Sequence, residues 1–443
     1  MKIAGAPFRR LRDVLPYLVD ERVGIVQQVF EVPREAGAPD FVHVASRACN
    51  TRAFTRHENF STAGGASADR ETALAKAVGE AVERYCAAIY DVDDLPLAAA
   101  ADAPFPCVPP DAFALYSAEQ LARPGFPWAP FEPDTPVRWT PARDPLTGQT
   151  CWVPAAMVYI PYLFYQGTGD APVVQPISTG LACHLSPAEA AVSGLCEVVE
   201  RDAFTIMWQA RLGMPQIRAE TLSDRNYDLV ARFERTGAAV TLLHLTLDAG
   251  IPTVLAVLRS PSPAAPALAF AAATAPDPEQ AVRKSLEELA HTRRYSQQIT
   301  TSLPRLVPEP EHGNVLDQMG HLNFWCDHAN ALLADFVFAS PERLEFDELP
   351  NLATGSAAGD LEVLARRLEA VGHRALVADL TTPDVRDLGL TVVRAVVPGF
   401  HPLFMGYGIR ALGGRRLWEV PQKLGHRGIT RAEGDNPYPH PYP

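Results

Sequence analysis

One motif, E-x-x-E-R, occurs twice in this chain, each time late in an apolar segment that is predicted to be a helix. A spacing of three places the two carboxylates of each copy on one helix face. Apolar neighbours predict that both helices are largely buried, and carboxylates are rarely buried without partners or a metal. The repeated motif therefore predicts four acids gathered around one or more cations: Glu80 and Glu83, followed by Arg84, and Glu197 and Glu200, followed by Arg201.

Composition excludes several classes of protein. The chain has 443 residues, a length that could hold one large domain or about two to three ordinary ones. Of its residues, 47% are hydrophobic, which is ample for a sizeable core. Its net charge of −13 argues against a general nucleic-acid binder, whose surface is usually basic. The chain has no stretch of 18 apolar residues, so no membrane span is predicted. The seven cysteines lack C-x-x-C spacing, which disfavours a disulfide framework or a structural zinc site and fits a reducing cytoplasm.

The order of predicted helices and strands indicates an α/β (mixed α+β) fold with large sheets and helices on their faces. Long helices are predicted over 69–90, from 186 onward and over 278–298, and a hairpin is predicted over 137–159. A Gly-rich turn is predicted over 61–67. The chain has no G-x-x-x-x-G-K-[ST] and no G-x-G-x-x-G after a strand, so any ATP site is neither a P-loop nor a Rossmann site.

Three blocks of sequence, taken in order, resemble the YcaO family of ATP-using enzymes that modify peptide backbones. Block 64–85 is similar to the family's Gly-rich turn and first acidic helix. Block 178–203 resembles its S-N-G-x-A loop and the helix that follows, and block 281–293 resembles its helix with a glutamate, a glutamine and an arginine. The resemblance covers roughly residues 20–443 and implies a YcaO-type fold.

Members of that family bind ATP through Mg²⁺ held by helix glutamates, so the resemblance implies ATP and Mg²⁺ as cofactors. Mg²⁺ prefers oxygen ligands and bridges carboxylates to phosphates. Arginines can neutralise phosphate or orient carboxylates, and glycines let main-chain N–H groups approach phosphate. The residues implied are Glu80, Glu83, Glu197 and Glu200 for the metal, and Gly64, Gly65, Arg84, Ser193, Arg201, Glu288 and Arg293 for the nucleotide.

The chain also departs from the family pattern. Ala66 stands where relatives commonly have a lysine, and Lys76 stands where they often have a serine. Thr179 replaces the asparagine of the S-N-G loop, and His291 replaces the glutamine of the third helix. A short Ser193 is the polar residue four positions before the third glutamate. These changes bear on individual nucleotide contacts.

The segment 436–443 reads N-P-Y-P-H-P-Y-P, and its alternating prolines favour an extended polyproline II conformation. Composition alone is equally typical of a disordered or partner-docking tail. Azoline-forming members of the YcaO family end in P-x-P-x-P, and that segment lies in their active site. The resemblance therefore implies that the carboxylate of Pro443, helped by His440, assists the proton transfers of cyclisation.

The function implied is that of an ATP-dependent cyclodehydratase. It would convert Cys, Ser or Thr of a ribosomally made precursor peptide into thiazoline or oxazoline by phosphorylating the backbone amide oxygen. The predicted organisation is a short N-terminal segment, 1–55, before one YcaO-like domain, 56–443. Because 1–55 is short for a leader-binding module, we expect an E1-like or leader-peptide-recognition partner protein. A flavin-dependent azoline dehydrogenase and a homodimer are implied by the family.

Other functions stay open at this point. Within the family, the product could be a thioamide or a macroamidine, although the P-x-P-x-P ending favours azolines. A non-catalytic scaffold that binds peptide is a second alternative, and an ATP-independent metallohydrolase is a third, although its usual His ligands lack a recognisable arrangement. One E-x-x-E-R alone is more typical of a surface charge cluster or a Glu–Arg clamp between helices.

Overall fold

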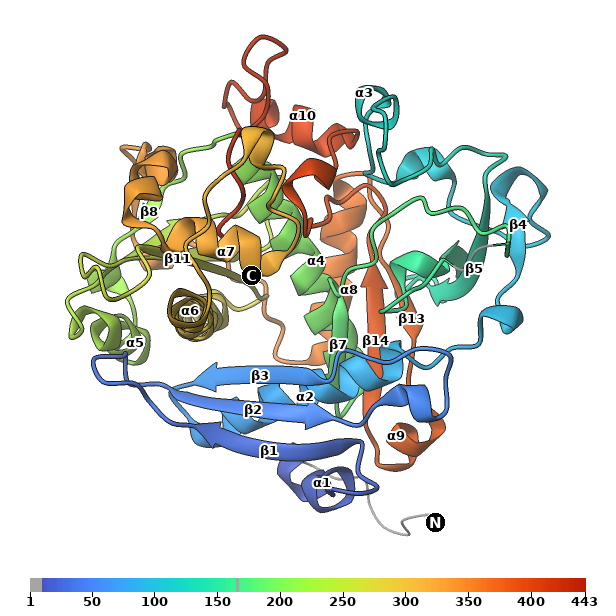
Figure 1. Ribbon diagram of the computed structural model, residues 1–443, viewed down its shortest axis with the longest axis horizontal. Helices are drawn as coiled ribbons and strands as arrows, with labels where there is room; N and C mark the ends of the chain where they lie inside the picture. Colours follow the sequence, from blue (N-terminus) through green and yellow to red (C-terminus); the bar gives the residue numbers. More distant parts are fainter. Residues whose placement is uncertain (1–9, 165–166) are drawn as a thin grey trace.

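The computed structural model builds three β-sheets, with long helices packed between and against them (Figure 1). It describes residues 10–164 and 167–443. The mixed α/β class predicted from the sequence is confirmed. Within this described part, no helix is long and apolar enough to cross a membrane.

The first sheet is antiparallel, with strand order β1-β2-β3, and runs along one side of the molecule (Figure 1). Helix α2 packs on β2 and β3. It begins after Asp69, whose side chain accepts a hydrogen bond from the N–H of Thr72 and so caps the helix. The bounds are α1 Leu11–Leu18, β1 Val26–Val32, β2 Val42–Ala48, β3 Thr62–Ser67 and α2 Arg70–Ala87.

The Gly-rich segment 61–67 is a strand, not the predicted turn. Thr62–Ser67 pairs with β2 along its whole length. Glycine is a poor strand former, but it allows the backbone of α2 to lie close to β3. The sheet also joins strands from both sides of residue 55, the predicted boundary between the N-terminal segment and the main domain.

The second sheet has the order β11-β10-β9-β8-β12. Its strand β11 (Leu268–Thr274) is buried along its whole length because both faces are covered. Phe270 packs among residues of α4 (Pro187–Gln209) and α7 (Gln318–Cys326), while Ala269 packs against α6 (Pro278–Ser302). Alternate side chains of a strand face opposite layers, which explains a continuous apolar segment. The remaining elements are β8 Gln216–Ile217, α5 Asp224–Glu234, β9 Ala239–His244, β10 Thr253–Arg259 and β12 Arg343–Leu344.

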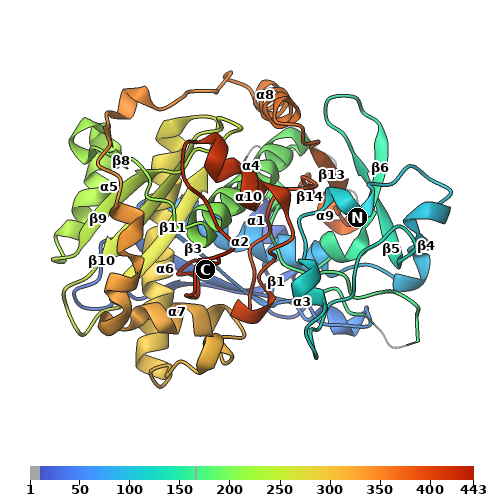
Figure 2. The same ribbon diagram turned by 90° about the horizontal axis from the view of Figure 1, so that it is seen from above.

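The third sheet has the order β4-β5-β13-β14-β7, with β6 paired to β5 as the predicted hairpin. Helix α4 packs on β14 and β7 of this sheet and also contacts β11, so it links the second and third sheets (Figure 2). The bounds are β4 Leu97–Ala99, β5 Pro136–Arg143, β6 Thr150–Pro154, β7 Leu181–His184, α8 Ala357–Ala370, β13 Leu376–Asp379, α9 Pro383–Asp387 and β14 Thr391–Val396.

Two further segments complete the fold. Between β4 and β5, a 3₁₀ turn at Pro110–Ala112 is followed by the one-turn helix α3 (Ala118–Leu121). After α10 (Arg415–Lys423) the chain turns inward, and the tail 436–443 brings the C-terminus to the centre of the molecule, near α4, α6 and α7 (Figures 1 and 2).

Candidate functional site

Three long helices, α2, α4 and α6, carry the glutamates predicted to form the site. The start of α4 is fixed as expected, with Ser186 accepting a hydrogen bond from the N–H of Glu189 and Pro187 in the first turn. Asp277 and Pro278 begin α6 in the same way. A fixed start sets the phase of a helix, and therefore the face on which its glutamates lie.

Each of the four glutamates in the two motifs accepts a hydrogen bond from a main-chain N–H outside its own helix. The donors lie on β3, on β7, just before β7 and at the end of β11. Because the backbone holds one oxygen of each carboxylate, it also sets the direction of the other oxygen. The bonds are Gly64 N to Glu80 Oε2 (3.0 Å), Cys183 N to Glu83 Oε1 (2.8 Å), Gly180 N to Glu197 Oε2 (3.0 Å) and Thr274 N to Glu200 Oε2 (3.3 Å).

The two motifs meet at β7, where Glu83 of α2 binds the N–H of Cys183 and Glu197 of α4 binds the N–H of Gly180 just before the strand. Burial, and then the charges of Glu80 and Glu197, raise the pKa of Glu83 to about 8. Burial also raises the pKa of Glu200 to about 7, although Arg201 acts in the opposite direction. Neighbouring carboxylates resist ionisation together unless a cation offsets their charge. The site is therefore a place where a bound cation is favoured.

This donor set fits Mg²⁺. The glutamates offer oxygen ligands only, and two of them hold protons more tightly than ordinary carboxyls do. In the described ranges, no group of three or more His, Cys, Asp or Glu side chains forms a ready-made metal cage. Mg²⁺ is usually held by one or two carboxylates together with phosphates and water. The arrangement suits Mg²⁺ that bridges to a phosphate, not a structural metal.

The arginine of each motif pairs with the first glutamate of its own motif, one helical turn earlier. Arg84 Nη2 lies 3.2 Å from Glu80 Oε1, and Arg201 Nη2 lies 3.6 Å from Glu197 Oε1. Arg201 Nη1 also donates to the main-chain oxygen of Pro443 at 2.8 Å. In this structure the arginines thus contact carboxylates, one of the two roles expected for them, and Arg201 ties its motif to the tail.

Packing requires glycine at position 65, whereas Gly64 lies against a side chain. A Cβ atom on Gly65 would lie 2.6 Å from the main-chain oxygen of Ala73 in α2. A Cβ on Gly64 would lie 2.8 Å from Nε2 of His291 in α6. The N–H of Gly64 binds Glu80, whereas the sequence predicted that it would approach phosphate. Contact of either glycine with a nucleotide stays a prediction.

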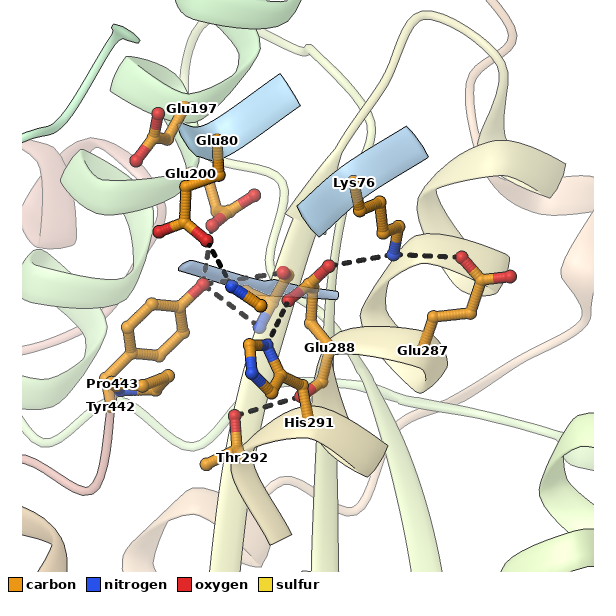
Figure 3. A network of polar contacts seen from close by, with 12 residues as sticks. Lys76, Glu80, Glu197, Glu200, Glu287, Glu288, His291, Thr292, Tyr442 and Pro443 are labelled. Atoms are coloured by element: carbon orange, nitrogen blue, oxygen red, sulfur yellow. Dashed lines mark hydrogen bonds and ion pairs between the residues drawn. The ribbon is translucent and has the colours of Figure 1, made fainter. Parts of the chain in front are cut away.

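Helix α6 adds Glu288, which lies beside Lys76 and His291 (Figure 3). Lys76 Nζ is 2.8 Å from Glu288 Oε1, and His291 Nδ1 is 3.8 Å from Glu288 Oε2. Burial raises the pKa of Glu288, but the charges of Lys76 and His291 outweigh it, so the net pKa lies below its usual range. Glu288 is therefore ionised and already paired.

Arg293, expected in the nucleotide site, pairs with Glu35 and Gln297 in this structure, and its contact with a nucleotide stays a prediction. Its Nη1 is 3.6 Å from Glu35 Oε2, and its Nη2 donates to Gln297 Oε1 at 3.3 Å. A residue two positions beyond His291 lies on a different face of the helix. The structure therefore places His291 beside the acidic cluster and Arg293 outside it.

Ser193 lies one turn before Glu197 on α4. Its hydroxyl is 2.8 Å from Nε2 of His184, at the end of β7. Burial lowers the pKa of His184, so its imidazole is neutral near pH 7. The predicted contact of Ser193 with a nucleotide stays a prediction.

The tail reaches the acidic site through Tyr442, a residue that the sequence did not single out. The phenolic O–H of Tyr442 donates to Glu200 Oε1 at 2.5 Å (Figure 3). The guanidinium of Arg201 lies over the Tyr442 ring, 4.6 Å from its centroid. The same oxygen accepts the N–H of Ala272 on β11 at 3.2 Å. The tail is thus an ordered, buried part of the site.

His440, expected to aid proton transfer, is used to hold the tail. Its Nδ1 accepts the N–H of Tyr442 at 3.2 Å, and Nε2 is 2.8 Å from the main-chain oxygen of Phe404. The ring stacks on His321 with centroids 3.9 Å apart. Burial lowers the pKa of His440 to about 4. With both nitrogens engaged and the ring neutral, His440 has a structural role in this arrangement.

Comparisons with known proteins agree with this geometry. A family model described as YcaO cyclodehydratase, ATP- and Mg²⁺-binding, matches residues 64–401. A protein from Methanothermobacter thermautotrophicus is 32% identical over 348 residues, which cover 76% of this chain and 81% of that protein. A Rhizobium leguminosarum bv. trifolii protein encoded in the tfuA 3′ region is 32% identical over 200 residues, 44% of each chain.

The chain belongs to the YcaO family. The resemblance predicted from the three sequence blocks is thereby confirmed, and ATP and Mg²⁺ are the cofactors of that family model. The matched region contains all four motif glutamates together with Glu288, whereas the tail 436–443 lies beyond it.

Solved structures share the YcaO fold. A heterocyclase in complex with substrate and cofactor has a TM-score of 0.77 at 20% identity, over 99% of this chain and 58% of its own. YcaO from Methanopyrus kandleri, bound with AMPPCP and Mg²⁺, has a TM-score of 0.62 at 22% identity over 88% of each chain. A chain of the E. coli microcin synthetase McbBCD complex has a TM-score of 0.63 at 14% identity, over 93% of this chain and 96% of its own.

Proposed function

We propose that this YcaO protein is an ATP-dependent cyclodehydratase that converts Cys, Ser or Thr of a ribosomally made precursor peptide into thiazoline or oxazoline. The observation that supports this most is the hydrogen bond between Tyr442 and Glu200. It joins the proline-alternating tail, the candidate element for ring closure, to a carboxylate of the candidate Mg²⁺ site. Activation and ring closure act on the same amide, so the two elements must lie together.

In the proposed reaction, the sulfur or oxygen of the peptide side chain attacks the preceding carbonyl carbon and loses its proton. The former carbonyl oxygen accepts the terminal phosphoryl group of ATP, which leaves ADP. Loss of the amide proton and departure of that oxygen as phosphate then form the C=N bond of the ring. The peptide loses one water per ring. Phosphorylation is needed because an amide oxygen is otherwise a poor leaving group.

The chain's own part is positioning and charge compensation. Bound Mg²⁺ would offset the charge of carboxylates and phosphates. Arg84 and Arg201 orient the carboxylates with which they pair. We assign Glu80, Glu83, Glu197 and Glu200 to the metal, keep Gly64, Gly65, Ser193, Glu288 and Arg293 as candidate nucleotide contacts, and place His440 outside the reacting groups for the reason given above.

Partners are part of the proposal. We expect a separate E1-like or leader-recognition protein that delivers the peptide, and a flavin-dependent dehydrogenase where azolines are oxidised to azoles. A homodimer is also proposed. One of the similar solved structures is itself of a complex, McbBCD, which is consistent with partner proteins.

The test is to incubate the protein with a Cys/Ser/Thr-rich peptide encoded beside its gene, any partner encoded there, and Mg-ATP. Peptide mass should fall by one water per ring while ADP and phosphate accumulate. Exchange of oxygen for sulfur would indicate a thioamide. A macroamidine also loses water but requires a peptide amine, so acetylating the amines separates the two. Unchanged peptide would count against the whole proposal.

The scaffold alternative is tested by nucleotide binding. A cyclodehydratase should bind AMPPCP only with Mg²⁺, and Glu80→Ala or Glu197→Ala should weaken that binding at least about 10-fold, as loss of an oriented metal ligand does. A scaffold would show neither binding nor sensitivity to these substitutions.

A further inference from the structure

Lys76 makes two short contacts with acids of another helix. Its ammonium lies 3.0 Å from Glu287 Oε2 and 2.8 Å from Glu288 Oε1, so one lysine of α2 bridges two adjacent carboxylates of α6 (Figure 3). Lys76 is four residues before Glu80 and therefore lies on the same helix face as that glutamate. Lys76 and the two carboxylates that it contacts are thus part of the acidic site, not of a remote surface.

The bridge is held in place from several sides. The side chain of Glu287 is 2% exposed, accepts the hydroxyl of Ser67 at 2.8 Å and lies 3.4 Å from Arg283 Nη1. A Cβ on Gly65 would lie 2.6 Å from the Cβ of Lys76, so β3 packs directly on the stem of the lysine. Glu287 is thus held by partners other than the lysine, and the packed stem of Lys76 directs the ammonium at the two carboxylates.

The other acids of the site differ in this respect. Glu80, Glu197 and Glu200 pair with the arginines of their own motifs at 3.2–3.7 Å, whereas Glu288 lies 2.8 Å from a lysine ammonium of another helix. Glu288 also keeps 43% of its side chain exposed, so it is open to an ion. The carboxylates of α6 therefore already hold a cationic group that comes from another helix.

We propose that Lys76 is a built-in cation of the nucleotide site, which occupies the position that a divalent ion would take at Glu288. The chain accordingly takes up one divalent ion fewer with its nucleotide than it would with a neutral residue at position 76. This inference rests on the proposed Mg-ATP function and specifies how the acidic site divides its charge between metal and protein.

The experiment counts Mn²⁺, used in place of Mg²⁺, taken up with AMPPCP, by electron paramagnetic resonance of the free ion. Lys76→Ser should take up one more ion per chain than the native protein. Lys76→Arg should match the native count because it keeps the charge. Lys76→Ser combined with Glu288→Gln should return to the native count, since the vacated position then lacks its carboxylate.

Lys423→Ser is the matched control. It removes the same charge from a side chain that is 57% exposed and that pairs with Glu419, also exposed, at 3.9 Å on α10. Its ion count should equal the native one. Circular dichroism of each variant, with Lys76→Met as a version that keeps the packed stem, separates loss of the ion from loss of the fold; Lys76→Met should also gain the ion.

The outcomes are distinct. Equal ion counts for the native protein and for folded Lys76→Ser and Lys76→Met would overturn the role of the lysine and leave the nucleotide site intact. Weaker AMPPCP binding with no added ion would identify Lys76 as a phosphate ligand and would likewise overturn the proposal. No ion uptake by the native protein with AMPPCP would remove the proposed function, and this inference with it.

Discussion

Tyr442 donates a hydrogen bond of 2.5 Å to Glu200, and this contact fastens the tail to the second E-x-x-E-R motif. The same phenolic oxygen accepts the N–H of Ala272. Helix α4 and the tail, which lie far apart in the sequence, are therefore in direct contact in the structure.

Tyr442→Phe should lower the free energy of unfolding by about 1–3 kcal/mol, because the buried N–H of Ala272 and the carboxyl of Glu200 both lose a partner. Urea titration gives this value. Tyr438→Phe is the control, since no hydrogen bond of its hydroxyl occurs among the described residues, and it should cost less than about 0.5 kcal/mol. Equal costs for the two variants would show that the bond to Glu200 contributes nothing.

Stability of the metal-free protein should depend on pH through Glu83. Folding raises the pKa of this carboxyl from 4.5 to about 8. A group with a raised folded pKa contributes stability at low pH that is lost as pH rises through the folded value. The free energy of unfolding should therefore fall between pH 4.5 and about 8, with Glu200 adding to the fall up to its own pKa of about 7.

Glu83→Gln should flatten this fall, because an amide does not titrate. Urea titrations of both proteins across the pH range give the comparison. Parallel curves for the native protein and Glu83→Gln would mean that Glu83 titrates normally.

Binding of Mg-AMPPCP should release protons near pH 7. Glu83 and Glu200 hold protons there in the metal-free protein, and a carboxyl must ionise to bind a cation. Calorimetry in buffers of different ionisation heat measures the protons released. The number should fall for Glu83→Gln and should approach zero well above pH 8. Identical enthalpies in all buffers at pH 7 would contradict the assigned ligands.

Gly65→Ala, compared with Gly79→Ala in α2, tests whether close packing explains the glycine in strand β3. A Cβ at Gly65 meets backbone at 2.6 Å, so Gly65→Ala should destabilise the protein by about 1–3 kcal/mol. No atom lies within 4 Å of a Cβ at Gly79, in the interior of α2, so Gly79→Ala should stabilise by about 0.5–1 kcal/mol. Thermal unfolding of the two variants should move in opposite directions; a shared direction would contradict the close packing of α2 on β3.

The sequence predicted the long helices well because their signals are local. Ser186 and Pro187 mark the start of α4, and the spacing of glutamates fixes one face. The pairing of the two motifs across α2 and α4 followed from burial alone. The Gly-rich strand was predicted as a turn because glycine is typical of turns. In the structure, the glycine at position 65 leaves room for the backbone of α2, a tertiary contact that the local sequence does not indicate.

The contacts that could not be predicted from the sequence are those of α6 with α2 and those of the tail with α4. His291 and Lys76 were noted only as departures from a family pattern, and their meeting at Glu288 depends on how α2 and α6 cross. Arg293 was assigned by motif position, but the helix turns it toward Glu35. Tyr442 carried no signal beyond the proline pattern around it.

The central claim is that the backbone amide oxygen of the peptide leaves as phosphate. The most direct measurement uses a precursor peptide labelled with oxygen-18 at the carbonyl preceding one cyclised residue. After reaction with Mg-ATP, mass spectrometry of the inorganic phosphate should find one labelled oxygen per ring formed. Label recovered in water, with unlabelled phosphate, would contradict the proposed cyclodehydratase mechanism.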